Sequence, residues 1–430
     1  MLDPLYTAAE MKAAEAGNDV QTLMDRAGRA VADEALRRYP DVRSFGAVCG
    51  GGANGGDGRI ALEVLRAAGK DAAEGAHGDV LIDALFGTGF HGEPRREAAR
   101  LIEQVNTAGV PVVAVDLPSG VDADTGEIAG AAVEADVTVT MHGRKIGLEV
   151  APGRFHAGEV VVADIGLEHS ETAAALVDRT VLGLVPRKRD ADNKYTAGAL
   201  LAVGGSPGMA GSVTLTTSAA FRADAGYVTV CSEVEPLVLE AVKRPLGEAF
   251  EVASRHGALA VGPGLGRSDE KRALVRRLLD ETDLPAVVDA DALFGLEPFN
   301  RAAPTVLTPH EGELGRLLDR ESSWVAAHRL AGVIEAAERF GCVCLLKGAD
   351  ALIAAPGEGI LVAASGPPSL ATAGTGDVLT GVIGAFLAKG MDARLAAAAA
   401  AVACDVAARL GHSRGLVASD VVELLPAALE

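Results

Sequence analysis

The sequence predicts an α/β protein with two domains, each built around a mainly parallel sheet. Its 430 residues are about twice the usual length of one domain. Apolar strands alternate with helical segments, an order typical of parallel sheets with crossover helices. Hydrophobic residues make up 49% of the chain and aromatic residues 3%, so the core must be mainly aliphatic. We therefore expect an N-terminal Rossmann-like three-layer domain followed by a second α/β domain.

Charge and cysteine content narrow the possible functions. A net charge of −20 argues against binding along the backbone of a nucleic acid, although backbone amides can still hold a small phosphorylated ligand. The five scattered cysteines favour reduced thiols and a cytoplasmic location. The N-terminus lacks the features of a signal peptide, and charged residues interrupt the Ala-rich stretch Arg394–Leu410. We expect no membrane span and interpret this stretch as a buried helix.

The first half is expected to begin with helices and then to form a parallel sheet. Thr7 and Glu10 have the spacing of a capping box at the start of the first helix. The predicted helices cover Met11–Ala16, Thr22–Tyr39 and Arg59–Ala68. The predicted strands cover Phe45–Cys49, Val80–Leu85, Val110–Val115, Asp136–Met141 and Glu159–Ile165.

Polar, glycine-containing loops follow three of these strands. Gly50–Gly58 carries Asn54 and Asp57 between a strand and a helix, an arrangement that can hold a phosphate at the helix N-terminus. Asp83–Gly89 and Asp116–Asp122 follow two further strands. Each loop alone could be a simple turn, since Asp and Gly are favoured in turns. Together they predict one pocket at the carboxyl ends of the strands, where parallel sheets bind ligands.

These loops contain motifs of a known family; the motifs are Cys49–Gly58, Asp83–Gly89, Val115–Gly126 and Lys145–Leu148. They are similar to the epimerase domain of NAD(P)H-hydrate repair enzymes, over residues 1–170. The resemblance implies a K⁺ ion held by Asn54, Asp83 and Ser119, and a role for Asp116 in proton transfer. The implied substrate contacts are Asn54, Gly55, Gly56, Asp57, Gly87, Thr88, Gly89, further residues up to Glu93, and Asp116.

The first half departs from the family pattern at two places. Ala53 stands where the family usually has Asn, and the interval between Gly58 and Asp83 is shorter than usual. The shorter interval implies a trimmed sheet. Two expectations therefore remain open for this domain: a weakened epimerase, or a domain that binds cofactor without catalysis.

A domain boundary is expected within residues 168–185, and the second domain over 185–430. A short helix over Ala173–Leu184 and the charged segment Pro186–Lys194 lie at this boundary. The next predicted elements are a strand, a glycine loop, a helix and a strand, at Ala199–Val203, Gly204–Ser212, Val213–Ala225 and Tyr227–Cys231. Later strands, each followed by a polar or glycine-containing loop, are Leu259–Val261, Ala286–Val288, Thr305–Leu307 and Val343–Leu346.

The segment Gly374–Asp377 precedes an apolar helix expected over Val378–Leu387. The backbone N–H groups of Gly374, Thr375 and Gly376 would lie at the helix N-terminus, where they can bind an anion. A carboxylate beside that anion could take a proton from a hydroxyl group. The alternative is a glycine turn in which Asp377 is only the N-cap.

The strand-end motifs of the second half occur in a characteristic order. They are Asn193-Lys194, Gly204–Ser206, Gly262–Gly266, Asp289–Leu293, Thr308–His310 with Glu313, Lys347-Gly348 and Gly374–Asp377. They resemble the ribokinase-like superfamily and, within it, the ADP- or ATP-dependent NAD(P)H-hydrate dehydratases. The implied substrate contacts are Ser212, Gly266, His310 and Asp377. The implied nucleotide contacts are Lys347, Gly348, Ala349, Asp350, Ala351, Gly374, Thr375 and Gly376.

The combined resemblance implies repair of hydrated NADH and NADPH. Asp377 would activate the C6 hydroxyl of the S hydrate for attack on the terminal phosphate of ADP or ATP, with Mg²⁺ bound to the nucleotide and Glu313 helping to hold it through water. ADP is the expected nucleotide, and a homo-oligomer is expected. Asn193, where His is common, and Ser212, where Ala is common, are departures. The alternatives are a ribokinase-like small-molecule kinase and a cofactor-binding scaffold without turnover.

Overall fold

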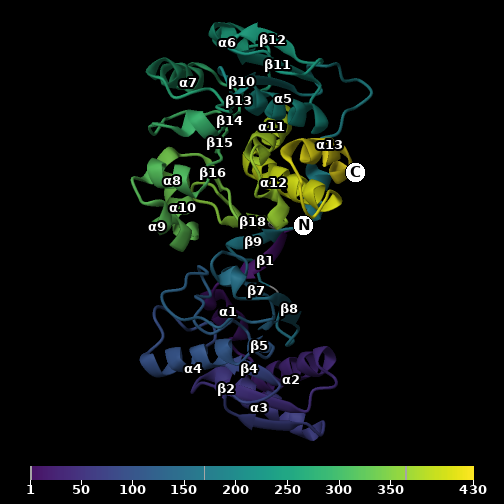
Figure 1. The fold of residues 1–430 in the computed structure, drawn as a ribbon, viewed down its shortest axis with the longest axis vertical. Coiled ribbons are helices and arrows are strands. Elements are labelled where there is room, and N and C mark those ends of the chain that lie inside the picture. The colour runs from purple at the N-terminus through teal and green to yellow at the C-terminus, as the bar shows by residue number, and fades with distance from the viewer. Residues whose placement is uncertain (1, 169, 364–365) are drawn as a thin grey trace. The chain divides into compact units, whose positions relative to one another are not determined.

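A computed structural model describes residues 2–168, 170–363 and 366–430. The chain forms two compact units, shown in Figure 1. The first unit is Pro4–Ala174, and the second is Ala175–Glu430 together with the first few residues of the chain. Each unit has its own sheet and its own aliphatic core.

The first unit contains a parallel sheet with strand order β3-β2-β4-β5-β6-β8. Its strands are β2 (Ser44–Cys49), β3 (Asp71–Glu74), β4 (Val80–Ala84), β5 (Val112–Val115), β6 (Val137–Met141) and β8 (Glu159–Ala163). Its helices are α1 (Ala8–Glu15), α2 (Val20–Arg38), α3 (Ala53–Ala67) and α4 (Arg96–Thr107). Two further short segments, β1 (Leu2–Tyr6) and β7 (Arg144–Lys145), pair with each other in parallel and are not strands of this sheet.

The glycine-rich loop after β2 is shorter than expected, because helix α3 begins at Ala53 and not at Arg59. Asn54 and Asp57 are therefore helical residues. A Cβ at Gly55 would lie 2.0 Å from the Gly50 carbonyl oxygen, and one at Gly58 would lie 2.5 Å from the Ala84 Cβ. The glycines thus let the start of the helix lie directly against the strand ends, a close approach that a side chain would block.

The second unit has the strand order β12-β11-β10-β13-β14-β15-β16-β17-β18-β9. The strands are parallel from β12 to β16 and antiparallel from β16 to β18. Their bounds are β9 (Ala174–Val177), β10 (Ala199–Val203), β11 (Tyr227–Ser232), β12 (Val242–Pro245), β13 (Ala258–Val261), β14 (Ala286–Val288), β15 (Thr305–Leu307), β16 (Val343–Leu346), β17 (Ala351–Ala354) and β18 (Ile360–Ala363).

Helices cover both faces of this second sheet. One group, on one side of the strands in Figure 1, is α7 (Asp269–Glu281), α8 (Glu311–Leu318), α9 (Ser322–Ala327) and α10 (Arg329–Phe340). The other group is α5 (Ala210–Arg222), α11 (Thr375–Ala388), α12 (Ala393–Leu410) and α13 (Ala418–Leu429), and it packs on the strands through one large aliphatic core. The short helix α6 (Ala249–Ala253) precedes β13.

The expected helix over Ala173–Leu184 is wrong in its first half. Residues Ala174–Val177 form β9, with Ala174 and Val177 buried, and a 3₁₀ helix then covers Arg179–Leu184. The Asp178 side chain accepts a hydrogen bond from the Thr180 N–H at 2.7 Å and so caps this second segment. The apolar run is too short for its periodicity to distinguish a strand from a helix.

The Ala-rich stretch forms the buried helix α12 in the core of the second unit. Among the described residues, no helix is both long and apolar enough to cross a membrane. All five cysteines are free thiols, and four of them are buried.

Candidate active sites

The expected anion site of the second unit lies at the start of α11. Gly374 is the N-cap with a φ of 92°, so Asp377 is the third residue of the helix and the N-cap alternative for it is wrong. Within the described chain, no acceptor is found for the backbone N–H groups of Thr375, Gly376 and Asp377. Unpaired N–H groups at a helix N-terminus bind anions, so this turn can hold a phosphoryl group.

The Asp377 carboxyl group is poised to exchange a proton near neutral pH. Burial, followed by the charge of Asp289, raises its pKa to about 6, while a hydrogen bond from Ser212 and the charge of Lys347 act in the opposite direction. The Asp377 backbone oxygen accepts a hydrogen bond from Thr216 Oγ1 at 3.0 Å, which ties α11 to α5. A base with a pKa close to the operating pH is suited to general base catalysis.

Lys347 and Asp289 form an ion pair beside this turn. Lys347 Nζ lies 2.7 Å from Asp289 Oδ1, and Thr380 Oγ1 donates to Asp289 Oδ2 at 2.7 Å. Burial alone would lower the pKa of Lys347, but Asp289 and Glu313 outweigh it and the pKa is raised. A Cβ at Gly376 would lie 3.4 Å from Lys347 Nζ, so a protonated ammonium group adjoins the anion site.

His310 is held in one orientation by the start of α8. His310 Nδ1 accepts hydrogen bonds from the N–H groups of Gly312, at 3.0 Å, and Glu313, at 3.3 Å. Glu313 Oε2 accepts the His310 N–H at 2.9 Å and lies 3.9 Å from Lys347 Nζ. With Nδ1 accepting, the neutral imidazole carries its proton on Nε2, which lies 3.4 Å from Glu313 Oε1.

The start of α5 and the loop after β13 bring Ser212 and Gly266 to the same edge of the sheet. Helix α5 begins at Ala210, earlier than expected, so Ser212 is a helical residue and not part of the glycine loop. A Cβ at Gly264 would lie 3.1 Å from the Ser212 Cβ, so the loop contacts the first turn of α5. The Gly266 N–H donates to Asp291 Oδ2 at 2.9 Å, and Arg267 Nε donates to Asp291 Oδ1 at 2.7 Å. These hydrogen bonds to Asp291 hold the loop that contains Gly266 in place. The φ of Gly266 is 88°.

The expected nucleotide loop Lys347–Ala351 rests on a buried arginine that the sequence did not single out. Arg329, 3% exposed, forms an ion pair with the fully buried Asp350 and donates from Nη2 to the Asp350 backbone oxygen at 3.1 Å. Its Nη1 lies 2.5 Å from Glu311 Oε1. The Asp350 carboxylate is thus paired with Arg329. Asp350 could therefore contact a nucleotide through its backbone and not through its carboxylate.

In the first unit, the three expected cation ligands lie around one small site. Asp83 is fully buried and accepts from the Ser119 N–H at 2.7 Å and from Ser119 Oγ at 2.6 Å. Phe86 connects the third residue, because its oxygen accepts from Asn54 Nδ2 at 2.7 Å and its N–H donates to Ser119 Oγ at 2.9 Å. Burial raises the pKa of Asp83 to about 6, and no ion pair with it is found among the described residues.

Asp116 and Lys145 form the charged centre of the first unit. Asp116, which has a φ of 66°, accepts hydrogen bonds from Thr140 Oγ1 and the Met141 N–H, both at 3.1 Å, and from Lys145 Nζ. The fully buried Lys145 also donates to Thr140 Oγ1 at 3.0 Å and to the Met141 oxygen at 2.9 Å. The motif Lys145–Leu148 is part of the family resemblance, but no role was predicted for the Lys145 side chain.

The remaining expected substrate contacts of the first unit lie on α3 and on the loop after β4. Asp57 is buried, and burial, followed by the charges of Asp116 and Glu15, raises its pKa to about 8. A Cβ at Gly87 would lie 3.2 Å from the Asn54 Cβ, which places this loop against α3. The other members of the set are Gly55, Gly56, Thr88 and Gly89, of which Gly89 is exposed.

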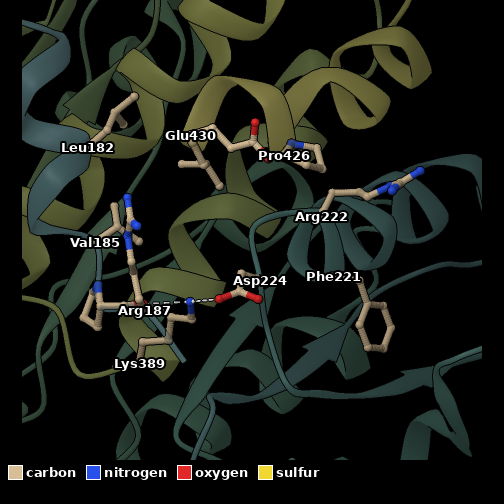
Figure 2. Close-up of a pocket in the computed structure, with 11 residues that line it drawn as sticks. Leu182, Val185, Arg187, Phe221, Arg222, Asp224, Lys389, Pro426 and Glu430 are labelled. Atoms are coloured by element: carbon tan, nitrogen blue, oxygen red, sulfur yellow. Dashed lines mark hydrogen bonds and ion pairs between the residues drawn. The ribbon is translucent and has the colours of Figure 1, made fainter. Parts of the chain in front are cut away.

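A cavity of about 340 Å³ in the second unit lies away from these residues (Figure 2). Lys389 lines it, just after the C-terminal end of α11, whose length of roughly 20 Å separates it from Asp377. Lys389 Nζ donates to Asp224 Oδ2 at 2.6 Å and to the Pro186 oxygen at 2.8 Å, so its charge is already satisfied. A second cavity, of about 280 Å³, includes Gly266 and Asp291 in its lining.

The fold and the Asp377 site define the class of the protein as a ribokinase-like α/β enzyme. A ribokinase-like protein from Enterococcus faecalis has the same fold, with a TM-score of 0.53 and 22% identity over 61% of this chain and 97% of that chain. The ADP/ATP-dependent NAD(P)H-hydrate dehydratase of Bacillus subtilis, crystallised with ATP and Mg²⁺, matches with a TM-score of 0.53 and 27% identity. That match covers 58% of this chain and 94% of the other.

The family model described as NAD(P)H-hydrate dehydratase matches residues 200–426, and that of the YjeF-related protein N-terminus matches residues 20–75 and 67–147. A bifunctional NAD(P)H-hydrate repair enzyme of Coxiella burnetii is 35% identical, over 96% of this chain and 95% of the relative. One from Escherichia coli is 33% identical, over 95% and 89%. The chain belongs to the family of bifunctional NAD(P)H-hydrate repair enzymes.

Proposed function

We propose that this chain restores NADH and NADPH from their hydrated forms. The second unit dehydrates the S hydrate in a nucleotide-dependent reaction through a domain proposed to cover residues 185–430. The first unit interconverts the R and S hydrates through a domain proposed to cover residues 1–170. The observation that carries the dehydratase assignment is the position of Asp377. Its carboxylate, with a pKa of about 6, stands in the first turn of α11 among N–H groups able to bind a phosphoryl group.

In the dehydration, Asp377 takes the proton of the C6 hydroxyl group as that oxygen attacks the terminal phosphorus of ADP or ATP. The bridging P–O bond breaks, AMP or ADP leaves, and the C6 oxygen becomes a phosphate ester. The N–H groups of Thr375 and Gly376 donate to the phosphoryl oxygens, and Lys347 adds a positive charge beside them. The C6–O bond then breaks and phosphate leaves with the bonding electrons, while the ring nitrogen supplies electrons to C6. Loss of a proton from C5 forms the C5–C6 double bond of the reduced nicotinamide.

His310, Gly266 and Ser212 are proposed to position the hydrate. His310 can donate a hydrogen bond from Nε2 because Nδ1 is occupied by backbone donors. The Gly266 loop is fixed by Asp291, and Ser212 donates to Asp377 itself. These contacts would orient the hydroxyl toward both the base and the phosphoryl group, and orientation of this kind contributes much of the rate in phosphoryl transfer.

The nucleotide is proposed to lie on Lys347–Ala351 and to bring Mg²⁺, which neutralises phosphate charge when bound. Glu313 does not fit a direct metal ligand, because its carboxylate accepts the His310 N–H at 2.9 Å and lies 3.9 Å from the Lys347 ammonium group. ADP is the proposed nucleotide. A homo-oligomer in the cytoplasm is also proposed, and the free cysteines are in keeping with that compartment.

In the first unit, Asp83, Ser119 and Asn54 fit a K⁺ site. Asp83 is a fully buried carboxylate whose described partners are neutral donors, so a cation of low charge density would compensate it. The ion would help to orient the phosphate-bearing part of the substrate. Asp116 is proposed to move the proton of the C6 hydroxyl group during epimerisation, with Lys145 holding its carboxylate in place.

One incubation tests the proposal against its alternatives. The full chain is mixed with NADPH hydrate, Mg²⁺ and either ADP or ATP, and the absorbance of the reduced nicotinamide is followed. Nucleotide-dependent recovery of NADPH, with release of phosphate, is the expected result. A stable phosphorylated alcohol would indicate a small-molecule kinase, and binding without turnover would indicate a scaffold.

A further inference from the structure

Asp57 has an unusual environment for an aspartate on a helix. It is 8% exposed, and no hydrogen-bond partner is found for its buried Oδ1 atom in the described part of the chain. Its neighbours on the helix are glycines, and the Met24 side chain packs where a Cβ of Gly56 would stand. A buried carboxylate without donors is unfavourable, so this group is stabilised in its neutral, protonated form.

The charged groups around Asp57 favour the same protonation state. Asp116 and Glu15 carry negative charge, and together with burial they raise the pKa of Asp57 to about 8. Lys145, the nearby cation, is saturated by Asp116, Thr140 and the Met141 oxygen and has no further donor for Asp57. At neutral pH Asp57 is therefore held as a neutral acid, within electrostatic range of Asp116.

Asp57 also lies at the same edge of the sheet as the other expected substrate contacts. It lies three residues after Asn54 on α3, so the two side chains share one face of the helix. Asn54 bonds to the Phe86 oxygen in the loop after β4, and Asp116 follows β5 directly. These positions all lie at the carboxyl ends of parallel strands in one sheet.

We propose that Asp57 is a second catalytic residue of the first unit, acting as the acid that works with Asp116 as the base. This inference rests on the proposed epimerase function and adds a role that substrate binding alone does not require. The buried Asp57 carboxyl group lacks a partner at Oδ1 among the described residues, whereas the Asp116 carboxylate accepts a hydrogen bond from Lys145 Nζ. Two carboxyl groups in such different environments are suited to opposite roles in acid–base catalysis.

The proposed step needs no reactant beyond the hydrate. Asp116 takes the proton of the C6 hydroxyl group, the C6–N1 bond breaks with its electrons going to N1, and a C6 carbonyl group forms. Asp57 gives its proton to N1. After rotation about the C5–C6 bond, N1 attacks the other face of the carbonyl carbon, returns its proton to Asp57, and the oxygen takes the proton from Asp116. The R hydrate thereby becomes the S hydrate.

The test uses the full chain and purified R hydrate without nucleotide, so that dehydration does not contribute. Formation of the S hydrate is followed by chromatography for the wild type, Asp57→Asn, Asp57→Glu and the control Glu63→Gln, an exposed acid on the same helix. Asp57→Asn is expected to slow epimerisation by about 10²–10⁴-fold, the usual contribution of a positioned acid. Glu63→Gln is expected to have no effect. Dehydration of the S hydrate with ADP, measured on each protein, reports whether the chain is folded and active.

The pH dependence separates a catalytic role from a structural one. The acid must be protonated, so wild-type epimerisation should fall as the pH rises through about 8, the pKa of Asp57. The epimerisation rate of Asp57→Glu should still fall at alkaline pH. Asp57→Asn should be slow at every pH and should show no such fall. Normal epimerisation by Asp57→Asn, or a slow variant that keeps the fall at alkaline pH, would overturn the role of Asp57 while leaving the epimerase intact. A wild type that dehydrates the S hydrate but leaves the R hydrate unchanged would overturn both.

Discussion

The ammonium group of Lys347 lies 2.7 Å from the carboxylate of Asp289, and this pair stands beside the anion site at the start of α11. The two residues follow different strands, β16 and β14, so the parallel sheet brings them together. Their charges act on Asp377 in opposite directions, Asp289 raising its pKa and Lys347 lowering it. The proton affinity of the proposed base is therefore set by residues distant in sequence.

The dehydration rate falls at acid pH, and Asp289→Asn should shift this fall, the acid limb of the pH profile, to lower pH. The wild-type rate is expected to fall as the pH drops through about 6, because Asp377 becomes protonated and can no longer act as a base. Removing the Asp289 charge lowers the pKa of Asp377, so the rate should persist to more acidic pH. The measurement is kcat against pH. An acid limb that does not move would show that Asp289 has no influence on the ionisation that controls the rate.

Ser212→Ala should shift the same limb in the opposite direction. The Ser212 hydroxyl donates to the Asp377 carboxylate and lowers its pKa. Its removal should raise that pKa, so that activity is lost at a higher pH than in the wild type. The same pH series checks this variant, and Ser268→Ala, at the exposed N-cap of α7, is the control for loss of a serine hydroxyl. A shift to lower pH in Ser212→Ala would contradict the proposed hydrogen bond.

Arg329→Met should weaken nucleotide binding more than hydrate binding. Arg329 holds the Asp350 carboxylate and backbone beneath the Lys347–Ala351 loop, and its loss leaves Asp350 buried without its cation. Removal of one partner of a buried ion pair is expected to lower the free energy of unfolding by about 3–5 kcal/mol. The KM for ADP should rise by roughly tenfold, equivalent to about 1.4 kcal/mol.

Steady-state kinetics with each substrate varied in turn, together with denaturant unfolding, check the Arg329→Met prediction. Arg339→Met, an exposed arginine on the same helix, is the matched control and should leave both quantities near the wild-type values. Equal increases in KM for ADP and for the hydrate would contradict a specific role of Arg329 in holding the nucleotide loop.

Asp83→Asn should abolish activation of epimerisation by K⁺. The substitution removes the buried negative charge that the proposed ion compensates, while the amide remains close in size. Wild-type epimerisation should rise with KCl at constant ionic strength, with choline chloride as the balancing salt. The variant should respond equally to both salts, and a K⁺ response that persists in Asp83→Asn would show that the ion binds elsewhere.

Local patterns predicted most of the strands that position the two sites. Short aliphatic runs such as Ala286–Val288 and Thr305–Leu307 become buried parallel strands, and polar loops follow them, as the sequence indicated. The start of a helix at Gly374–Gly376 was also predictable, because glycines before an apolar helix have a recognisable spacing. Asp377, however, is inside the first turn, since Gly374 can adopt the positive φ of the N-cap.

The parts that could not be predicted depend on contacts between distant residues. Helix α3 starts at Ala53 because its glycines lie against Gly50 and Ala84, which local propensity does not reveal. Arg329 and Asp350 are 21 residues apart, and no recognisable motif contains both of them. The protonated state of Asp57 likewise follows from its burial and from Asp116, which lies on another strand end.

The most direct test of the account is the dehydration rate of Asp377→Asn with the S hydrate, ADP and Mg²⁺ at saturating concentrations. The variant keeps the size of the side chain but cannot take the hydroxyl proton. Its kcat should fall by about 10²–10⁴-fold, the usual range for a positioned base, while thermal unfolding and R-hydrate epimerisation by the same protein remain at wild-type levels. Wild-type turnover by a folded Asp377→Asn protein would show that Asp377 is not the base in dehydration.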